Sequence, residues 1–200
     1  LIEGKPLPAR RYAFIRLCDS LGVEPEKVGL VPYALAEWTE RLAVAFAEHR
    51  KWPKNPFIQA KCQVFAGILA HYAQDASQPL HLTIHYNGRK LPDGSVEQKG
   101  IHAKVDGLPL TLEMKPEDLA KGLQVAPLDS LMEGIVDQID DGFKLVDYVY
   151  ELGPRIPSFG QKDWERDEQV ITFAVGRARE SVRFTATLFL TAWKKSAGLE

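Results

Sequence analysis

Five stretches of the chain carry apolar residues at intervals of three and four, the spacing that places side chains on one face of an α-helix. Each stretch is long enough for a packed helix, and no stretch of comparable length alternates apolar and polar residues as a strand does. The stretches cover residues 10–22, 32–52, 56–75, 127–153 and 167–196. The sequence therefore predicts an all-α fold.

Residues at the ends of these stretches support the helical interpretation. Pro56 stands in a first turn, where a missing N–H is tolerated, and Asp129 can accept a hydrogen bond at a helix start. Gly153 followed by Pro154 stops a helix. The expected boundaries thus agree with the expected periodicity.

A different kind of sequence separates the third and fourth stretches. Residues 81–123 are rich in turn-forming pairs such as Asn87-Gly88, and we expect an irregular loop that leads into a short helix from Ile101 to Gly107. No linker divides the chain, so the prediction is a single multi-helix domain over residues 1–200 with an irregular central loop region. Because the chain starts at Leu1 and not at a methionine, we expect either a processed product or a piece of a longer protein.

Charge and hydropathy exclude several classes of protein. The 25 Lys and Arg residues nearly balance the 27 Asp and Glu residues, so the net charge of the chain does not favour binding to nucleic acid or to a membrane surface. No apolar run approaches the roughly 18 residues that cross a bilayer. We therefore expect a chain that does not span a membrane, and nothing in the pattern indicates a stable protein partner. Cys18 and Cys62 are either two buried thiols or a disulfide, and neither belongs to a CxxC metal motif.

Candidate metal ligands begin near the end of the third helical stretch. His71 and Asp75 are four residues apart, which places them one turn apart on the same helix face. Pro79 cannot continue a helix interior and favours an extended Gln78, so the backbone must turn before it presents His81. A histidine beyond such a turn can point where a helical residue cannot.

The same spacing recurs in His102 and Asp106. Imidazole and carboxylate are ligands that zinc accepts, and the absence of nearby cysteine favours a hydrolytic site over a closed thiolate site. Each histidine taken alone could be an ordinary hydrogen-bonded boundary residue, but packing alone rarely places so many ligand types in this pattern. Five ligands exceed the needs of one catalytic zinc, so we expect two metal ions.

This pattern resembles the ligand signature of the zinc-dependent phospholipase C and single-strand-specific nuclease superfamily, whose members are helical phosphoesterases with a trinuclear zinc cluster. The signature runs His, three residues, Asp, a short stretch ending in Pro-Leu-His, then His, three residues and an acid. It matches HYAQDASQPLH and HAKVD in this chain, within residues 67–106.

The resemblance implies a role for each ligand. His71 would ligate a first zinc, Asp75 would bridge the first and third and act in catalysis, and the second zinc would be held by His81, His102 and Asp106. The implied activity is phosphodiester hydrolysis on a phospholipid head group, a single-stranded nucleic acid or a small molecule. Two or three zinc ions are implied for the intact protein, and a secreted or periplasmic location is implied as well.

The chain departs from the family at its N-terminus. Family members supply an upstream Asp and His and a mature N-terminal Trp as further ligands, whereas only His49 precedes His71 here and Leu1 stands in place of Trp. We expect that a missing N-terminal segment carries these ligands. The alternative is a helical binding or structural module in which one zinc at His81, His102 and Asp106 pins the central loop without catalysis.

Other residues near the candidate ligands in sequence are candidates for contacts with a metal ion or a substrate. His85 is left out of the ligand set, because the family has no equivalent. Positive side chains could attract a phosphate, although a solvated surface is the simpler interpretation, and aromatic rings could stack on a base. These are Arg89, Lys90, Lys99, Lys104, Tyr72 and Tyr86.

Overall fold

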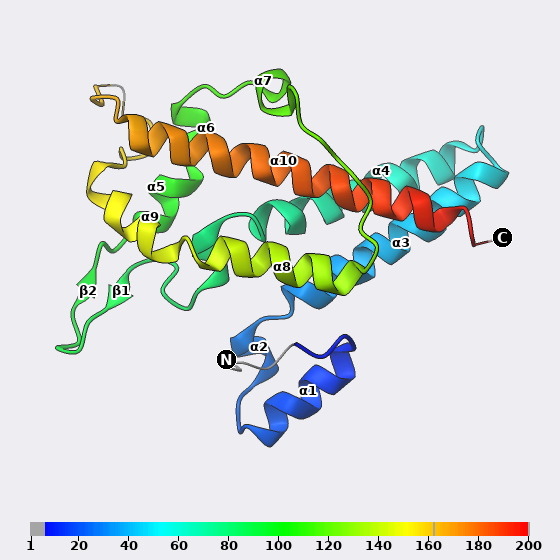
Figure 1. Cartoon of the computed structure of the whole chain (residues 1–200), viewed down its shortest axis with the longest axis horizontal. Helices are drawn as coiled ribbons and strands as arrows, with labels where there is room; N and C mark the ends of the chain where they lie inside the picture. Colours follow the sequence, from blue (N-terminus) through cyan, green and yellow to red (C-terminus); the bar gives the residue numbers. More distant parts are fainter. Residues whose placement is uncertain (1–6, 162, 200) are drawn as a thin grey trace. The chain divides into compact units, whose positions relative to one another are not determined.

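The computed structural model describes residues 7–161 and 163–199, and it confirms the all-α fold (Figure 1). Leu1, where the resembled family has Trp, lies outside this range. The elements in chain order are α1 (Arg11–Ser20), α2 (Pro25–Val28), α3 (Val31–Lys51), α4 (Pro56–Asp75), the 3-10 turn η1 (Pro79–Leu82), β1 (Arg89–Lys90), β2 (Val96–Glu97), α5 (Ile101–Asp106), α6 (Leu108–Thr111), α7 (Pro116–Ala120), α8 (Leu131–Phe143), α9 (Val146–Leu152), the 3-10 turn η2 (Gly153–Arg155) and α10 (Glu168–Ser196).

The predicted helix over residues 127–153 is interrupted. It forms α8 and α9, with Lys144 and Leu145 in a turn between them. The Leu145 N–H donates to the Gly142 carbonyl at 3.1 Å, an interval of three that tightens the chain beyond an α-helix. A Cβ added at Gly142 would lie 2.6 Å from Leu82 Cδ1, so the glycine allows close approach of the η1 segment. Periodicity alone could not show this break, because apolar residues continue through it.

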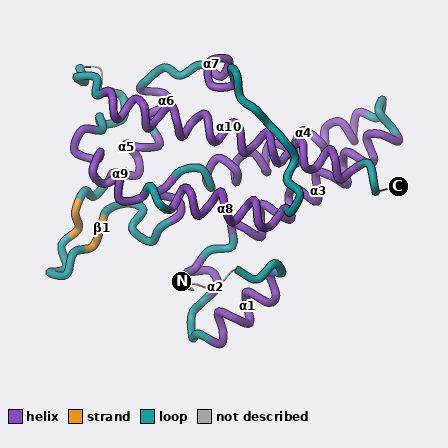
Figure 2. The backbone as a smooth tube through the Cα atoms, in the orientation of Figure 1, coloured by secondary structure: helices purple, strands orange, loops and turns teal. Residues whose placement is uncertain are grey.

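The central region is partly ordered into small elements. The predicted short helix near Ile101 is present as α5. The turn pair Asp93-Gly94 closes a hairpin in which β1 and β2 pair antiparallel, with Arg89 opposite Glu97 (Figure 2). Gly94 has φ +85°, a conformation that glycine adopts without steric cost, and Asp93 accepts a hydrogen bond from the Ser95 N–H at 2.9 Å. The expected irregular loop is therefore a hairpin followed by short helices.

The chain divides into two compact units. One comprises residues 1–72, 126–137 and 187–200, and the other comprises residues 73–125 and 138–186. The expected single domain over residues 1–200 therefore stays a prediction. The first unit contains a cluster of Phe14, Cys18 and Tyr33. The second has a larger core that fixes the candidate site, formed by Leu80, Ile101, Val105, Leu108, Val146, Val149, Tyr150, Leu152, Ile156, Val170, Phe173 and Ala174.

Both cysteines are free thiols, so the disulfide alternative is not the arrangement found. Cys18 is buried, and Cys62 is half-buried with its thiol directed at the Ala45 carbonyl at 3.4 Å. Burial raises the pKa of the Cys62 thiol, which keeps it protonated and unreactive. Among the described residues, no helix is long and apolar enough to cross a membrane.

Candidate metal centre

Buried residues in η1 fix the position of His81. Gln78 is extended, with φ −97° and ψ 116°, as expected for a residue before proline, and Pro79 begins the 3-10 turn. Pro79 and Leu80 are buried, and Leu80 belongs to the core of the second unit. Because the buried residues hold one face of the turn against the core, the His81 side chain lies on the opposite face, where it is 26% exposed.

Helix α5 presents the second pair of ligands by the same principle. Ile101 and Val105 are buried in the core, four residues apart. His102 and Asp106 follow each of them by one position, so they lie together on the neighbouring face of the helix. Gly100 precedes the helix with φ +92°, which lets the chain turn sharply into it. The core residues thus determine where the ligands point.

The three predicted ligands of the second zinc converge. The Nε2 atoms of His81 and His102 are 2.8 Å apart, a distance at which one ring donates a hydrogen bond to the other. Asp106 places one carboxylate oxygen 3.3 Å from His102 Nε2 and the other 3.6 Å from His81 Nε2. One ligand atom from each residue lies within 4.8 Å of the others.

These distances fit a metal ion. Ligands about 2.1 Å from a tetrahedral zinc lie about 3.4 Å from one another. The spacings from Asp106 to the two histidines, 3.3 and 3.6 Å, are close to this value, and the two Nε2 atoms, 2.8 Å apart, are closer together. Two imidazole nitrogens and one carboxylate also form the ligand set of an open zinc site, which leaves a fourth position for water or substrate. We call His81, His102 and Asp106 the triad below.

Asp75 lies on the opposite side of the His81 ring from the triad. Its carboxylate is 3.3 Å from Nδ1 of His81, so it favours the tautomer in which Nδ1 carries the proton and Nε2 keeps its lone pair. Interaction with Asp106 raises the pKa of His81, burial opposes it, and the Asp75 charge raises it further. In this position Asp75 would orient His81 if His81 binds metal, whereas the resemblance makes Asp75 a bridging ligand.

Gln78 also belongs to the candidate metal centre, although the sequence analysis does not single it out. Its amide nitrogen donates to Asp106 at 2.9 Å, and its carbonyl oxygen accepts from the Leu80 N–H, so it joins η1 to α5. Burial raises the pKa of Asp106, but the interaction with His81 and the hydrogen bond from Gln78 outweigh it and hold that pKa below its usual range. The position of Gln78 directly before Pro79, where a side chain often caps the following turn, is the sequence feature that indicates this role.

The remaining candidates do not belong to the triad. His71 is in the other compact unit, with its ring 5.8 Å from that of Tyr72, and its role as a ligand stays a prediction. Tyr86 packs edge-on against His102, with ring centroids 5.7 Å apart. Arg89 forms an ion pair with Asp147 and lies over the ring of Tyr150. None of the four proposed cations lines the pocket described next; these are Arg89, Lys90, Lys99 and Lys104.

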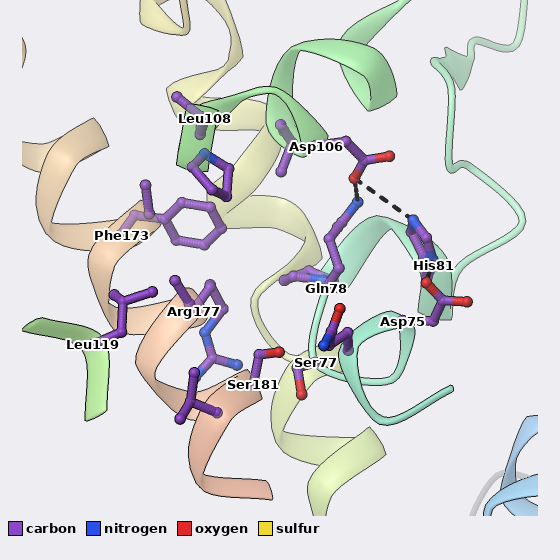
Figure 3. A pocket seen from close by; sticks show the side chains of 17 residues that line it. Asp75, Ser77, Gln78, His81, Asp106, Leu108, Leu119, Phe173, Arg177 and Ser181 are labelled. Atoms are coloured by element: carbon purple, nitrogen blue, oxygen red, sulfur yellow. Dashed lines mark hydrogen bonds and ion pairs between the residues drawn. The ribbon is translucent and has the colours of Figure 1, made fainter. Parts of the chain in front are cut away.

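A pocket of about 400 Å³ opens beside the triad. Figure 3 shows His81, Asp106 and Asp75 on one side of it and Arg177 on the other. Apolar side chains form much of its wall, namely Val105, Leu108, Pro109, Leu119, Phe173 and Val182. A ligand at the triad would therefore have an apolar surface within reach.

Comparisons of the chain with protein-family models, with curated proteins and with solved structures gave no match. The family assignment therefore stays a prediction from the signature.

Replacing Asp75 with asparagine tests the role that the geometry gives it. If Asp75 orients His81, Asp75→Asn should weaken zinc binding by about 10- to 100-fold while the number of zinc ions bound at saturation stays the same. Zinc titration against a competing chelator measures the affinity, and elemental analysis measures the stoichiometry. A lower zinc content at saturation would contradict the orienting role and support the bridging role.

Proposed function

We propose that the intact protein is a zinc-dependent phosphodiester hydrolase whose metal centre includes the triad. The observation that carries the proposal is the convergence of His81, His102 and Asp106 beside an apolar pocket. All three residues come from the signature that resembles zinc phosphoesterases. Substrates of this chemistry include a phospholipid head group, a single-stranded nucleic acid and a small phosphodiester.

The donor set fits the proposed metal. A bound zinc ion would polarise a phosphoryl oxygen and lower the pKa of a water molecule toward neutrality. The chain itself supplies orientation: Asp75 holds the Nδ1 side of His81, and Gln78 holds one oxygen of Asp106. Two of the three ligands, His81 and Asp106, are thereby kept in place before substrate arrives, which reduces the reorganisation needed during reaction.

A structural zinc site is the second candidate. The triad joins η1 to α5 across the whole hairpin region, so a metal ion there would close a loop of the central segment. Such a site would stabilise the fold without turnover. It needs no ligands beyond those in the triad, which is its advantage.

Metal content and hydrolysis separate the two. The full chain is loaded with zinc, its zinc content is measured by elemental analysis, and hydrolysis of bis(nitrophenyl) phosphate is followed with and without a chelator. We expect bound zinc and turnover that the chelator removes and added zinc restores. Bound zinc without turnover would support the structural site. A chain that binds no zinc would overturn both.

A further inference from the structure

Arg177 on α10 is half-buried among apolar residues that line the pocket. Phe173 and Ala174 are buried core residues three and four positions before it, so Arg177 continues their face of the helix. Its Nη1 atom is buried and has no hydrogen-bond partner within residues 7–161 and 163–199. Figure 3 shows the Arg177 side chain beside Ser181 in the pocket.

Neighbouring arginines on the same helix are used differently. Arg179 donates to three backbone carbonyls around α7, and Arg183 donates to Glu180 and Gln138. Both guanidinium groups therefore have an evident structural use. Arg177 differs from them because it lines the pocket and has one guanidinium nitrogen without a partner among the described residues.

Nearby carboxylates do not meet this nitrogen. Glu180 pairs with Arg183, and Asp141 pairs with Lys144 at 2.7 Å. They act on Arg177 only through space, and burial lowers the pKa of Arg177 more than their charges raise it. A guanidinium stays charged even so. A buried donor without a partner is costly, and the cost is offset when an oxyanion accepts its hydrogen bond.

The pocket chemistry indicates the kind of ligand. A guanidinium fork matches the two oxygens of a carboxylate or phosphate, and the Ser181 hydroxyl lies one turn further along the same pocket wall. Leu108 and Phe173 offer apolar contacts to the rest of the ligand. The combination suits a small molecule with an apolar or aromatic body and a terminal anion.

We propose that Arg177 binds a phosphate or carboxylate group of a ligand whose apolar part occupies this pocket. That the ligand is the substrate of the metal centre rests on the proposed function; the substrate then carries a second anionic group besides its phosphodiester. Arg177 thereby determines specificity and takes no part in the reaction itself.

Titration of the full chain with phenyl phosphate, benzoate and inorganic phosphate tests the binding. It is done by calorimetry after chelator treatment, so that zinc cannot hold the anion. We expect saturable binding of phenyl phosphate, tighter than that of inorganic phosphate because the ring contacts the apolar wall. Benzoate shows whether carboxylate serves as well as phosphate. Arg177→Gln should weaken phenyl phosphate binding by about 10- to 100-fold, and Arg177→Lys, which keeps the charge but loses the fork, by less.

Arg166→Gln is the matched control, because Arg166 is exposed and does not line the pocket. It should leave phenyl phosphate binding unchanged. Absence of saturable binding, equal binding by the Arg177→Gln variant, or an equal loss in the Arg166→Gln variant would overturn the inference. Thermal unfolding of each variant checks that it folds, and should Arg177→Gln not fold, the Arg177→Lys comparison decides.

The outcomes separate this inference from the proposed function. A chain without zinc binding or turnover whose Arg177→Gln variant still loses phenyl phosphate affinity retains the anion site and lacks the enzyme. A zinc-dependent hydrolase whose Arg177→Gln variant binds phenyl phosphate normally retains the enzyme and lacks the anion site.

Discussion

Replacing His102 with alanine should weaken zinc binding by well over 100-fold and abolish zinc-dependent phosphodiester hydrolysis. Removing a group that only orients a metal ligand costs about 10- to 100-fold in affinity, and His102 is expected to be a ligand itself. Its Nε2 lies 2.8 Å from that of His81 and 3.3 Å from Asp106, so its loss opens one side of the triad. Zinc competition titrations and hydrolysis of bis(nitrophenyl) phosphate measure the two effects.

His85→Ala is the matched control, because His85 is another histidine of the central region that the triad does not include. Its backbone carbonyl accepts a hydrogen bond from Tyr150, and an alanine keeps that carbonyl. The His85→Ala variant should bind zinc and hydrolyse substrate as the natural chain does. An equal loss in both variants would mean that the ligand set is wrong. Full zinc affinity in the His102→Ala variant would place the metal elsewhere.

The ligands of the triad could be predicted from the sequence because their geometry is local. His102 and Asp106 share one helix, and Pro79 begins the 3-10 turn that carries His81. These features follow from helical spacing and from the missing N–H of proline. No tertiary information is required to see them.

The role of Asp75 could not be obtained in the same way. Its spacing from His71 suggested a shared metal, but the structure places its carboxylate against Nδ1 of His81. That contact depends on the path of the chain between α4 and η1, which the spacing of residues in the sequence does not determine. The same tertiary dependence hid the hydrogen bond from Gln78 to Asp106.

The sequence contains one indication that Arg177 is unusual. Arg177 lies at helical intervals from Phe173 and Phe184, two buried aromatic residues of α10. A charged residue in a buried stripe is rarely fully buried without a reason. What the sequence could not show is that this stripe lines the same pocket as residues about a hundred positions earlier.

Replacing Leu80 with alanine should destabilise the fold by about 2–5 kcal/mol, the usual cost of removing a fully buried leucine side chain. Leu80 is 0% exposed and packs in the core of the second unit. Chemical denaturation followed by circular dichroism measures the loss. Leu80→Met, which conserves volume, should cost less than about 1.5 kcal/mol. Ile84→Ala is the exposed control, since Ile84 is 80% exposed, and it should change stability by less than about 0.5 kcal/mol.

Leu80 also links the stability of the core to the metal centre. It stands between the turn-forming Pro79 and the ligand His81, so loosening its packing should let the imidazole move away from His102. We therefore expect the Leu80→Ala variant to bind zinc more weakly while keeping all three ligands, and added zinc to recover part of the lost stability, because an ion that binds only the folded chain stabilises it. Normal zinc affinity combined with a loss of more than about 2 kcal/mol would show that the core and the metal centre are independent. A loss of less than about 1 kcal/mol would contradict the burial of Leu80 as the anchor of η1.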